Sequence, residues 1–317
     1  MSDTEEYRDG RVLRSTGSWY DVETPEGVVP SKVRGKFRLE DTRQTNPAVV
    51  GDRVTIRMVE DDTGMITEIH PRDNQLVRRA AGRRVGMEHV LAANIDHAWV
   101  VQSVRKPKIN TGFVDRFLVM CEAFEIPAGL VINKIDLMRP ADEDIVLEIC
   151  DLYADLGYPV LPVSAETGEN VDVLADVLKD SVSVLAGGSG VGKSTLLNAI
   201  EPGLQLRTGR ISESTQKGKH TTTFASLVPL SEGGYVVDTP GVREYGLVAI
   251  EPYELGHYFP EFRPYLHDCR FPTCTHDHEP GCAVVDALEQ DLIDPVRYGS
   301  YLNMLHSVQA GDADVGR

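Results

Sequence analysis

Residues 187–195 read Gly187-Gly188-Ser189-Gly190-Val191-Gly192-Lys193-Ser194-Thr195 and fit the phosphate-loop pattern G-x-x-x-x-G-K-[ST]. Residues 183–186 before this stretch are apolar, as in a buried strand, and residues 196–200 after it have the composition of a helix. In that setting the glycines let backbone N–H groups surround phosphate oxygens, and the helix N-terminus adds its dipole. An ordinary glycine-rich turn would not require the Lys-Ser pair, so the sequence predicts a nucleotide site. Lys193 can reach the β- and γ-phosphates, and the Ser194 hydroxyl can ligate Mg²⁺.

Composition limits the possible classes of protein. A chain of 317 residues predicts two or three domains, and no apolar run approaches the roughly 18 residues of a membrane span. The acidic, polar first residues are unlike a signal peptide, so we expect a cytoplasmic protein without membrane contact. Five cysteines, three of them clustered, favour a metal site over disulfides. The net charge of −17 means that any nucleic-acid contact must come from local basic patches.

The first 77 residues predict a small β domain. Residues 10–15 and 18–22 around a Thr-Gly turn suggest a hairpin, and further strand-like runs cover residues 33–39, 53–58 and 65–69. About five short strands in so few residues indicate a small closed barrel such as an OB-fold. The pattern alone does not separate an OB-fold from an SH3-like barrel.

One stretch of this domain is a candidate RNA-binding face. Lys32, Arg34, Lys36 and Arg38 alternate with other residues, and the period of two in a strand puts all four cations on one side. Aligned like charges repel one another, which an anionic partner such as RNA would explain. The alternative is a merely solvated face with acidic residues nearby.

A basic segment, residues 71–96, looks like a linker, and an α/β pattern follows it. Residues 98–102 and 130–132 are expected to form strands, with helical spacing in residues 114–121 between them. The second strand leads into Asn133-Lys134-Ile135-Asp136, which fits the guanine-reading pattern N-K-x-D. The Asp136 carboxylate can accept hydrogen bonds from N1–H and the 2-amino group of guanine. Adenine lacks this donor pair and would leave a carboxylate unpaired.

The next β–α unit supports the guanine assignment. Residues 141–156 predict a helix with Ile145, Ile149 and Leu152 on one side, and residues 159–163 predict a strand that runs into Ser164-Ala165. In GTPases a Ser-Ala at this place supplies a backbone N–H to the guanine carbonyl. A further helix over residues 171–178 then leads to the phosphate loop.

After the phosphate loop, residues 202–220 form a long polar connection that we interpret as a first switch. Thr222, or else Thr221, is expected to complete the magnesium shell. Residues 235–237 predict a strand that ends in Asp238-Thr239-Pro240-Gly241, a D-x-x-G match. We expect Asp238 to act on Mg²⁺, usually through water, and the Gly241 N–H to contact the γ-phosphate.

The motif order is unusual, because GTPases normally begin with the phosphate loop and end with the guanine motif. A circular permutation of the same sheet would give the present order. Val242 stands where Ras-like enzymes place a water-orienting Gln, so intrinsic hydrolysis is expected to be slow. His220 is the candidate to orient water or accept its proton, or else it only packs or contacts a partner.

The C-terminal region contains a candidate metal site. Three thiolates and one imidazole, from Cys269, Cys274, His276 and Cys282, would make a closed, structural tetrahedral site, and a buried cysteine cluster is the alternative. The region is otherwise helical and acidic. Tyr298, Tyr301, Leu302 and Leu305 form one apolar stripe, expected to pack against this site. Cys121 and Cys150 lie in helix patterns as apolar residues.

The permuted order, the barrel before it and the Cys-x4-Cys-x-His-x5-Cys cluster after it together resemble the ribosome small-subunit-dependent GTPases, the RsgA (YjeQ/YloQ) family. The resemblance covers nearly the whole chain. It implies an OB-fold over residues 1–77, a circularly permuted GTPase domain over residues 78–245 and a zinc-binding helical domain over residues 246–317. It implies one structural Zn²⁺ on the four C-terminal ligands, Mg²⁺ with GTP, and nucleotide contacts from residues 133–136 and 187–195. In this family a histidine before the switch threonines has a proposed catalytic role, which fits His220. Gly188 departs from many relatives, which carry Gln there.

The implied function is GTP hydrolysis during late maturation of the small ribosomal subunit, stimulated by that subunit. Partners are then the subunit with its rRNA and GTP or GDP, and we expect a monomer. Catalysis would involve His220, Lys193 and Gly241. A metabolic P-loop kinase or ATPase is disfavoured by the guanine motif. A nucleotide-gated RNA- or ribosome-binding scaffold with incidental hydrolysis stays open because of Val242.

Overall fold

The computed structural model describes residues 6–35, 47–59, 62–79, 88–204, 225–238 and 250–310. The chain divides into two compact units: the first comprises the described parts of residues 1–98, 171–186 and 194–242, and the second those of residues 99–170, 187–193 and 243–317. Several predicted site residues lie outside the described residues: Lys36, Arg38, His220, Thr221, Thr222, Gly241 and Val242. None of the helices in the described ranges is long and apolar enough to cross a membrane.

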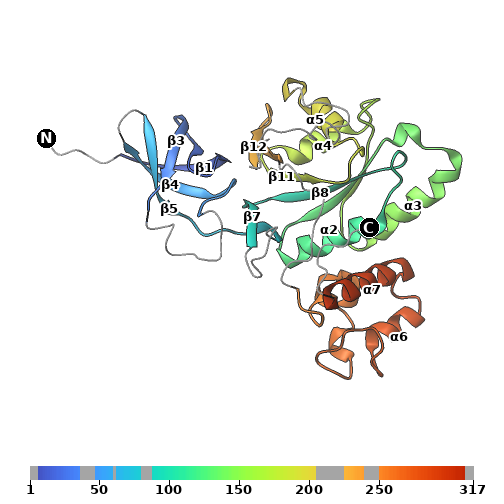
Figure 1. The fold of residues 1–317 in the computed structure, drawn as a ribbon. Coiled ribbons are helices and arrows are strands. Elements are labelled where there is room, and N and C mark those ends of the chain that lie inside the picture. The colour runs from blue at the N-terminus through green and yellow to red at the C-terminus, as the bar shows by residue number, and fades with distance from the viewer. Residues whose placement is uncertain are drawn as a thin grey trace, which may run out of the picture. The chain divides into compact units, whose positions relative to one another are not determined.

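The N-terminal part of the first unit is a closed five-stranded barrel (Figure 1). Its strands are β1 (Tyr7–Ser15), β2 (Tyr20–Thr24), β3 (Gly27–Val33), β4 (Arg53–Val59) and β5 (Thr63–Ile69). They are ordered β1-β2-β3-β5-β4, β4 pairs back onto β1, and β3 runs parallel to β5. Alternate side chains, among them Val12, Val22, Val54, Ile56 and Ile66, fill the interior. This is the OB-type barrel, and it settles the choice that the sequence pattern left open.

The position of β3 differs from the prediction. The strand occupies Gly27–Val33, whereas the apolar alternation favoured residues 33–39. Pro30 made the earlier stretch look unlike a strand, but the parallel pairing with β5 begins only at Ser31, one residue after the proline. Of the four predicted cations, Lys32 lies near the end of β3 and Arg34 just after it, and both are exposed.

The predicted linker over residues 71–96 is wrong in part. Two strands, β6 (Gln75–Arg79) and β7 (Glu88–Ala93), form an antiparallel pair within it. Leu76, Val77, Val90 and Ala92 are buried and supply the apolar surface that stabilises the pair. The arginines and glycines between the strands obscured this short apolar alternation.

The first unit also contains two strands that pair in parallel, β11 (Val182–Ala186) and β13 (Tyr235–Asp238). A strand that the sequence analysis missed, β12 (Ser226–Pro229), pairs antiparallel with β13 and also meets β1, where Ser226 lies opposite Arg14. The Tyr235 hydroxyl donates to the Glu23 carboxylate of β2, and the Arg11 guanidinium lies 5.4 Å from the centre of the Tyr235 ring. Helix α4 (Val171–Leu178) and most of α5 (Lys193–Ile200) belong to this unit.

The second unit contains the strands β8 (His97–Ser103), β9 (Ala128–Asn133) and β10 (Val160–Pro162) in the order β10-β9-β8. Helix α2 (Thr111–Ala123) begins at Asn110, whose side chain accepts a hydrogen bond from the Phe113 N–H. Helix α3 (Pro140–Asp155) lies where it was expected, but the predicted apolar side is wrong. Ile145 is exposed, and Val146 and Tyr153 are the buried residues.

The C-terminal region of this unit consists of three short 3-10 turns and two helices, α6 (Ala283–Glu289) and α7 (Pro295–Gln309). Figure 1 shows α7 beside α2, and the two helices are in contact. The apolar core of the region includes Phe259, Phe262, Tyr301 and Leu305 together with Val119 of α2. The C-terminal core is therefore continuous with a helix of the nucleotide-binding fold.

Candidate functional site

Asn133 connects the three loops that the sequence assigned to the nucleotide. It ends β9 and is buried. Its Nδ2 donates to the Val191 carbonyl of the phosphate loop at 2.9 Å, and its Oδ1 accepts from the N–H groups of Lys134 at 2.8 Å and Ala165 at 3.2 Å. One side-chain amide thus brings the guanine motif, the phosphate loop and the Ser-Ala loop together. The sequence predicted the three motifs but not this connection.

Lys134 makes a second connection to the phosphate loop. Its backbone is left-handed, with φ of 64°. Its ammonium donates to the carbonyls of Lys106, at 2.6 Å, and of Gly190. Burial lowers the pKa of this ammonium, and the positive charge of Lys106 lowers it further, against an opposing effect of Asp136. The carbonyl of Lys106, just after β8, has no sequence signature and was not predicted.

Asp136 is exposed and its carboxylate is oriented by Ser164. The buried Ser164 hydroxyl donates to Asp136 Oδ1 at 2.6 Å and accepts from the Thr167 N–H at 3.1 Å. The Ile135 N–H also donates to the Val163 carbonyl at 3.3 Å, which fixes the motif against the strand end. The Ser-Ala pattern predicted only a backbone role for this pair, whereas its serine side chain holds the carboxylate proposed to recognise guanine.

The phosphate loop has glycine where its backbone requires glycine. Gly187, Gly190 and Gly192 have φ of +147°, +83° and +99°. A Cβ at Gly187 would lie under 3.0 Å from the Val101 carbonyl, and a Cβ at Gly192 would lie equally close to the Asn133 amide. At Gly188 the nearest atom to a Cβ would be 4.0 Å away, so this position can accept a side chain.

Lys193 is held over the same loop. Its ammonium donates to the carbonyls of Gly187 at 2.6 Å and Gly188 at 3.0 Å. The parallel register of β11 with β13 pairs Val184 with Val237, so Asp238 follows at the carboxyl end of β13. The backbone of Asp238 thereby lies beside the carboxyl end of β11. The magnesium assignments to Ser194, Thr222 and Asp238 remain predictions.

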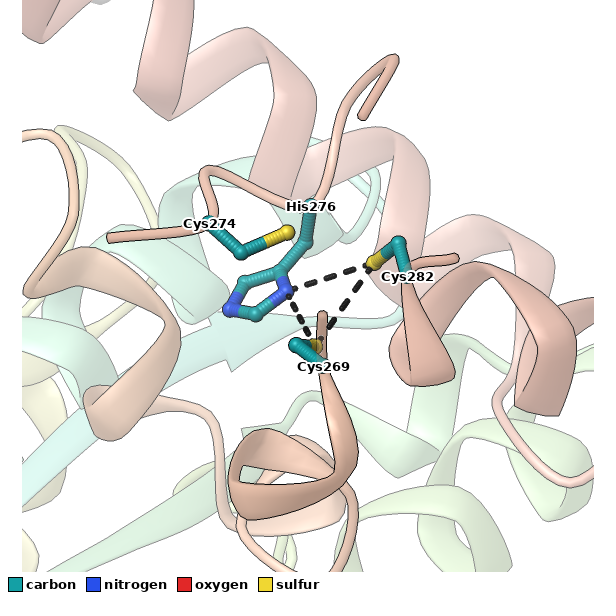
Figure 2. A group of neighbouring side chains, drawn as sticks. All are labelled: Cys269, Cys274, His276 and Cys282. Atoms are coloured by element: carbon teal, nitrogen blue, oxygen red, sulfur yellow. Dashed lines mark hydrogen bonds between the residues drawn. The ribbon is translucent and has the colours of Figure 1, made fainter. Parts of the chain in front are cut away.

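The predicted cluster in the C-terminal region is assembled, as Figure 2 shows. The sulfur atoms of Cys269, Cys274 and Cys282 and a ring nitrogen of His276 all lie within 4.8 Å of one another. The Nδ1 of His276 is 3.5 Å from the Cys269 sulfur and 3.4 Å from the Cys282 sulfur. Burial raises the pKa of the Cys274 thiol to about 12 and also raises that of Cys282. Four convergent soft donors make a group that could hold a metal ion.

The loop that carries the cluster is held from several sides. Burial opposes ionisation of the Glu279 carboxyl, but hydrogen bonds from the Thr275 side chain and backbone dominate and lower its pKa to about 2. The hydroxyls of Tyr298 and Tyr301 donate to the carbonyls of His276 at 2.8 Å and Thr275 at 2.6 Å. The predicted apolar stripe of α7 therefore packs against the cluster, and its tyrosines also hydrogen-bond to it.

The barrel, the permuted motif order and the assembled guanine and phosphate loops define a circularly permuted P-loop GTPase fold with a C-terminal metal-type cluster. The family model RsgA GTPase matches residues 69–248, and the model RsgA N-terminal domain matches residues 9–66. The chain belongs to the RsgA GTPase family.

Curated relatives match this chain over nearly its full length. "Small ribosomal subunit biogenesis GTPase RsgA 2" of Bacteroides thetaiotaomicron is 44% identical over 303 residues, covering 95% of this chain and 97% of that protein. A protein of Flavobacterium psychrophilum named "Small ribosomal subunit biogenesis GTPase RsgA" is 43% identical over 300 residues, covering 93% and 92%.

Two solved structures share the fold. YjeQ from Thermotoga maritima has a TM-score of 0.79 and 38% identity, over 98% of this chain and 100% of that one. YloQ, described as a circularly permuted GTPase, has a TM-score of 0.75 and 29% identity, over 98% of both chains.

Proposed function

We propose that this protein binds the small ribosomal subunit and hydrolyses GTP to GDP and phosphate during late maturation of that subunit. The names of its full-length relatives support the ribosomal role. The single observation that carries the nucleotide assignment is the side chain of Asn133, which joins the guanine motif to the phosphate loop and to the Ser-Ala loop.

Guanine selectivity follows from the orientation of Asp136. The Ser164 hydroxyl holds one carboxylate oxygen, so the carboxylate is oriented before the base arrives. Guanine offers two donors to this carboxylate, its N1–H and its 2-amino group. Adenine lacks this pair and would leave the negative charge of the carboxylate without a hydrogen bond. Asn133, Lys134 and Ala165 frame the base. We expect GTP and GDP to bind at least 100-fold more tightly than ATP and ADP, in line with the discrimination that unpaired polar groups produce.

In the hydrolysis step, backbone N–H groups of the phosphate loop and the Lys193 ammonium would bind the β- and γ-phosphates, and a bound Mg²⁺ would neutralise the negative charge that develops on them. Ser194, Thr222 and Asp238 are proposed to hold the Mg²⁺, and the Gly241 N–H to contact the γ-phosphate. Val242 cannot orient water, so His220 is assigned to orient the attacking water or accept its proton.

The C-terminal cluster is proposed to bind one structural Zn²⁺. With Zn–S near 2.3 Å and Zn–N near 2.1 Å, tetrahedral geometry would place sulfurs about 3.8 Å apart and a sulfur about 3.6 Å from the nitrogen. The observed Cys269–Cys282 sulfur separation is 4.0 Å, and the two sulfur–nitrogen separations are 3.5 and 3.4 Å. Four protein ligands leave no open position, so the ion would stabilise the region and supply no chemistry to the phosphates.

The barrel is proposed to contact rRNA. Lys32 and Arg34 are exposed, and the Lys32 ammonium lies 4.2 Å from the centre of the half-exposed Trp19 ring. A cation beside an accessible aromatic ring is a surface on which RNA bases can stack. Lys36 and Arg38 are assigned to the same face from the sequence alone. We further expect a cytoplasmic monomer with domains at residues 1–77, 78–245 and 246–317.

The test is GTP turnover by the purified protein with and without small ribosomal subunits, alongside His220→Ala and Asp136→Asn. Strong stimulation that both substitutions abolish supports a ribosome-triggered GTPase that uses His220. Stimulation that survives His220→Ala removes only the catalytic role of that histidine. If subunits do not stimulate turnover, the second candidate, a nucleotide-gated scaffold with incidental hydrolysis, explains Val242 better.

A further inference from the structure

A groove of about 530 Å³ lies in the second unit, between the end of α3 and the turns that precede α7. Its apolar surface includes Leu152 of α3, Leu156 just after that helix, and Tyr265 and Leu292 of the C-terminal region. The volume is within the range of ligand sites, but the groove is apart from every residue assigned to the nucleotide or to the metal cluster. The proposed GTPase cycle therefore makes no use of it.

Carboxylates surround this apolar surface. Asp155, Glu261, Asp291 and Asp294 all line the groove. Its one lining cation is Arg297, whose side chain is 1% exposed and is committed to Glu261 and to a buried aspartate of α2. Asp294 is partly engaged as the N-cap of α7. The groove therefore presents net negative charge to solvent.

Two of these carboxylates, those of Asp155 and Asp291, form no ion pair with any residue that the structure describes. Both residues are exposed. Two exposed carboxylates on opposite elements of one groove favour a cationic occupant, since each gains a partner that none of the described residues provides.

Leu292 gives the groove an apolar anchor point. Its side chain is 58% exposed, although the adjacent Ile293 is buried in the C-terminal core. The turn that carries it is tied down, because the N–H groups of Leu292 and Asp291 donate to the carbonyls of Ala287 at 3.0 Å and Leu288 at 3.1 Å. A leucine held outward on a rigid turn can bury apolar surface against a partner with little ordering cost.

We infer that this groove binds a lysine- or arginine-rich protein segment, which places an apolar side chain against Leu292 and its cations on Asp155 and Asp291. This inference rests on the proposed function, and the segment is then part of a protein of the small subunit. RNA is disfavoured as the occupant because its phosphates would face carboxylates, and the one cation among the lining residues, Arg297, is already paired. The groove and the basic barrel face would thus contact chemically different parts of one particle.

The first experiment is site-specific photo-crosslinking. Full-length, metal-loaded protein carrying Leu292→p-benzoylphenylalanine is mixed with purified small subunits and a non-hydrolysable GTP analogue, irradiated, and analysed by mass spectrometry. The matched control is the same substitution at Leu147, which is 59% exposed on α3 but does not line the groove. Crosslinks from position 292 to a basic protein segment, absent at position 147, support the inference. Crosslinks to rRNA, or none while subunits bind, overturn it.

The second experiment reverses the charges. The pair Asp155→Lys with Asp291→Lys is compared with the control pair Glu143→Lys with Glu148→Lys, two exposed acids of α3 outside the groove. We expect the first pair to weaken subunit binding at least tenfold, about 1.4 kcal/mol, and the control to change it less than twofold. Equal binding by both pairs overturns the groove inference and leaves the proposed function intact. If wild-type protein does not bind subunits, the proposed function itself fails.

Discussion

Replacing Arg297 with methionine should strongly destabilise the second unit. The Arg297 guanidinium is 1% exposed, and its Nη1 donates to Asp115 Oδ1 at 2.5 Å. Two further donors reach the Glu261 carboxylate at 2.7 and 3.2 Å, and the Phe259 ring lies 4.7 Å from the guanidinium. Tyr153 donates to the same Asp115 oxygen at 2.6 Å. The guanidinium is therefore the only cation that these fully or largely buried carboxylates contact among the described residues.

The expected loss of stability follows from the two carboxylates, Asp115 and Glu261, that would lose their cation. At an effective dielectric constant of 20, each close ion pair contributes roughly 4 kcal/mol before desolvation, so two pairs contribute about 8 kcal/mol. Relaxation or protonation of the stranded carboxylates recovers part of this loss. Breaking a buried pair by removing one partner typically costs about 3–5 kcal/mol, and we expect Arg297→Met to lie in that range.

The assay is denaturant unfolding of the metal-loaded protein, compared across three variants. Arg263→Met is the matched control, because Arg263 also pairs with a carboxylate, Glu122, but its side chain is 48% exposed. It should cost less than about 1 kcal/mol. Combining Arg297→Met with Asp115→Asn and Glu261→Gln removes the stranded charges and should recover at least half of the loss. The reasoning is refuted if Arg297→Met costs no more than the control, or if the triple variant is no more stable than the single one.

Four further predictions concern the nucleotide site, the metal cluster and the barrel contact. Gly192→Ala should abolish GTP binding in equilibrium titrations, since its Cβ would clash with the asparagine amide, whereas Gly188→Ala should bind normally. Asp136→Asn should weaken GTP binding at least 100-fold and favour xanthosine triphosphate, whose base offers an acceptor in place of the 2-amino donor. Cys282→Ser, or chelation, should release about one zinc per chain, measured by metal analysis, and lower the unfolding midpoint. Burial and a hydrogen bond to a glutamate raise the pKa of Tyr235 from 10.0 to about 12, so stability present below pH 10.0 should fall as the pH rises towards 12, and Tyr235→Phe should make that fall in the unfolding midpoint less steep.

Motifs that need a fixed backbone were readable from the sequence. The phosphate loop requires glycine where φ is positive, and the chain has glycine at 187, 190 and 192. The four C-terminal ligands were predicted because thiol and imidazole donors are chemically distinctive. Buried strands such as β9 and β11 were predicted because continuous apolar runs are typical of parallel sheets.

Features that depend on tertiary contacts were not readable. Strands β6 and β7 have only a short alternation of apolar residues and lie within a basic segment. The basic composition therefore predicted a linker where the structure has two paired strands. The buried side of α3 was misassigned because it is set by Tyr153, whose hydroxyl is satisfied by a carboxylate 38 residues away. The bond from Ser164 to Asp136 joins two loops whose distance in space no local pattern encodes.

Helix α2 connects the Asn-Lys-x-Asp motif to the Cys-His cluster within the second unit. The loop before the helix supplies the Lys106 carbonyl that accepts from Lys134 of the guanine motif. Further along, Asp115 binds Arg297 of α7, and Val119 lies in the C-terminal core. A displacement of α2 would therefore disturb both the guanine motif and the C-terminal core. The buried ion pair between Asp115 and Arg297 opposes such a displacement. This arrangement predicts that Arg297→Met lowers stability without changing the preference for guanine over adenine, because the groups proposed to contact the base are held by hydrogen bonds that do not involve α7.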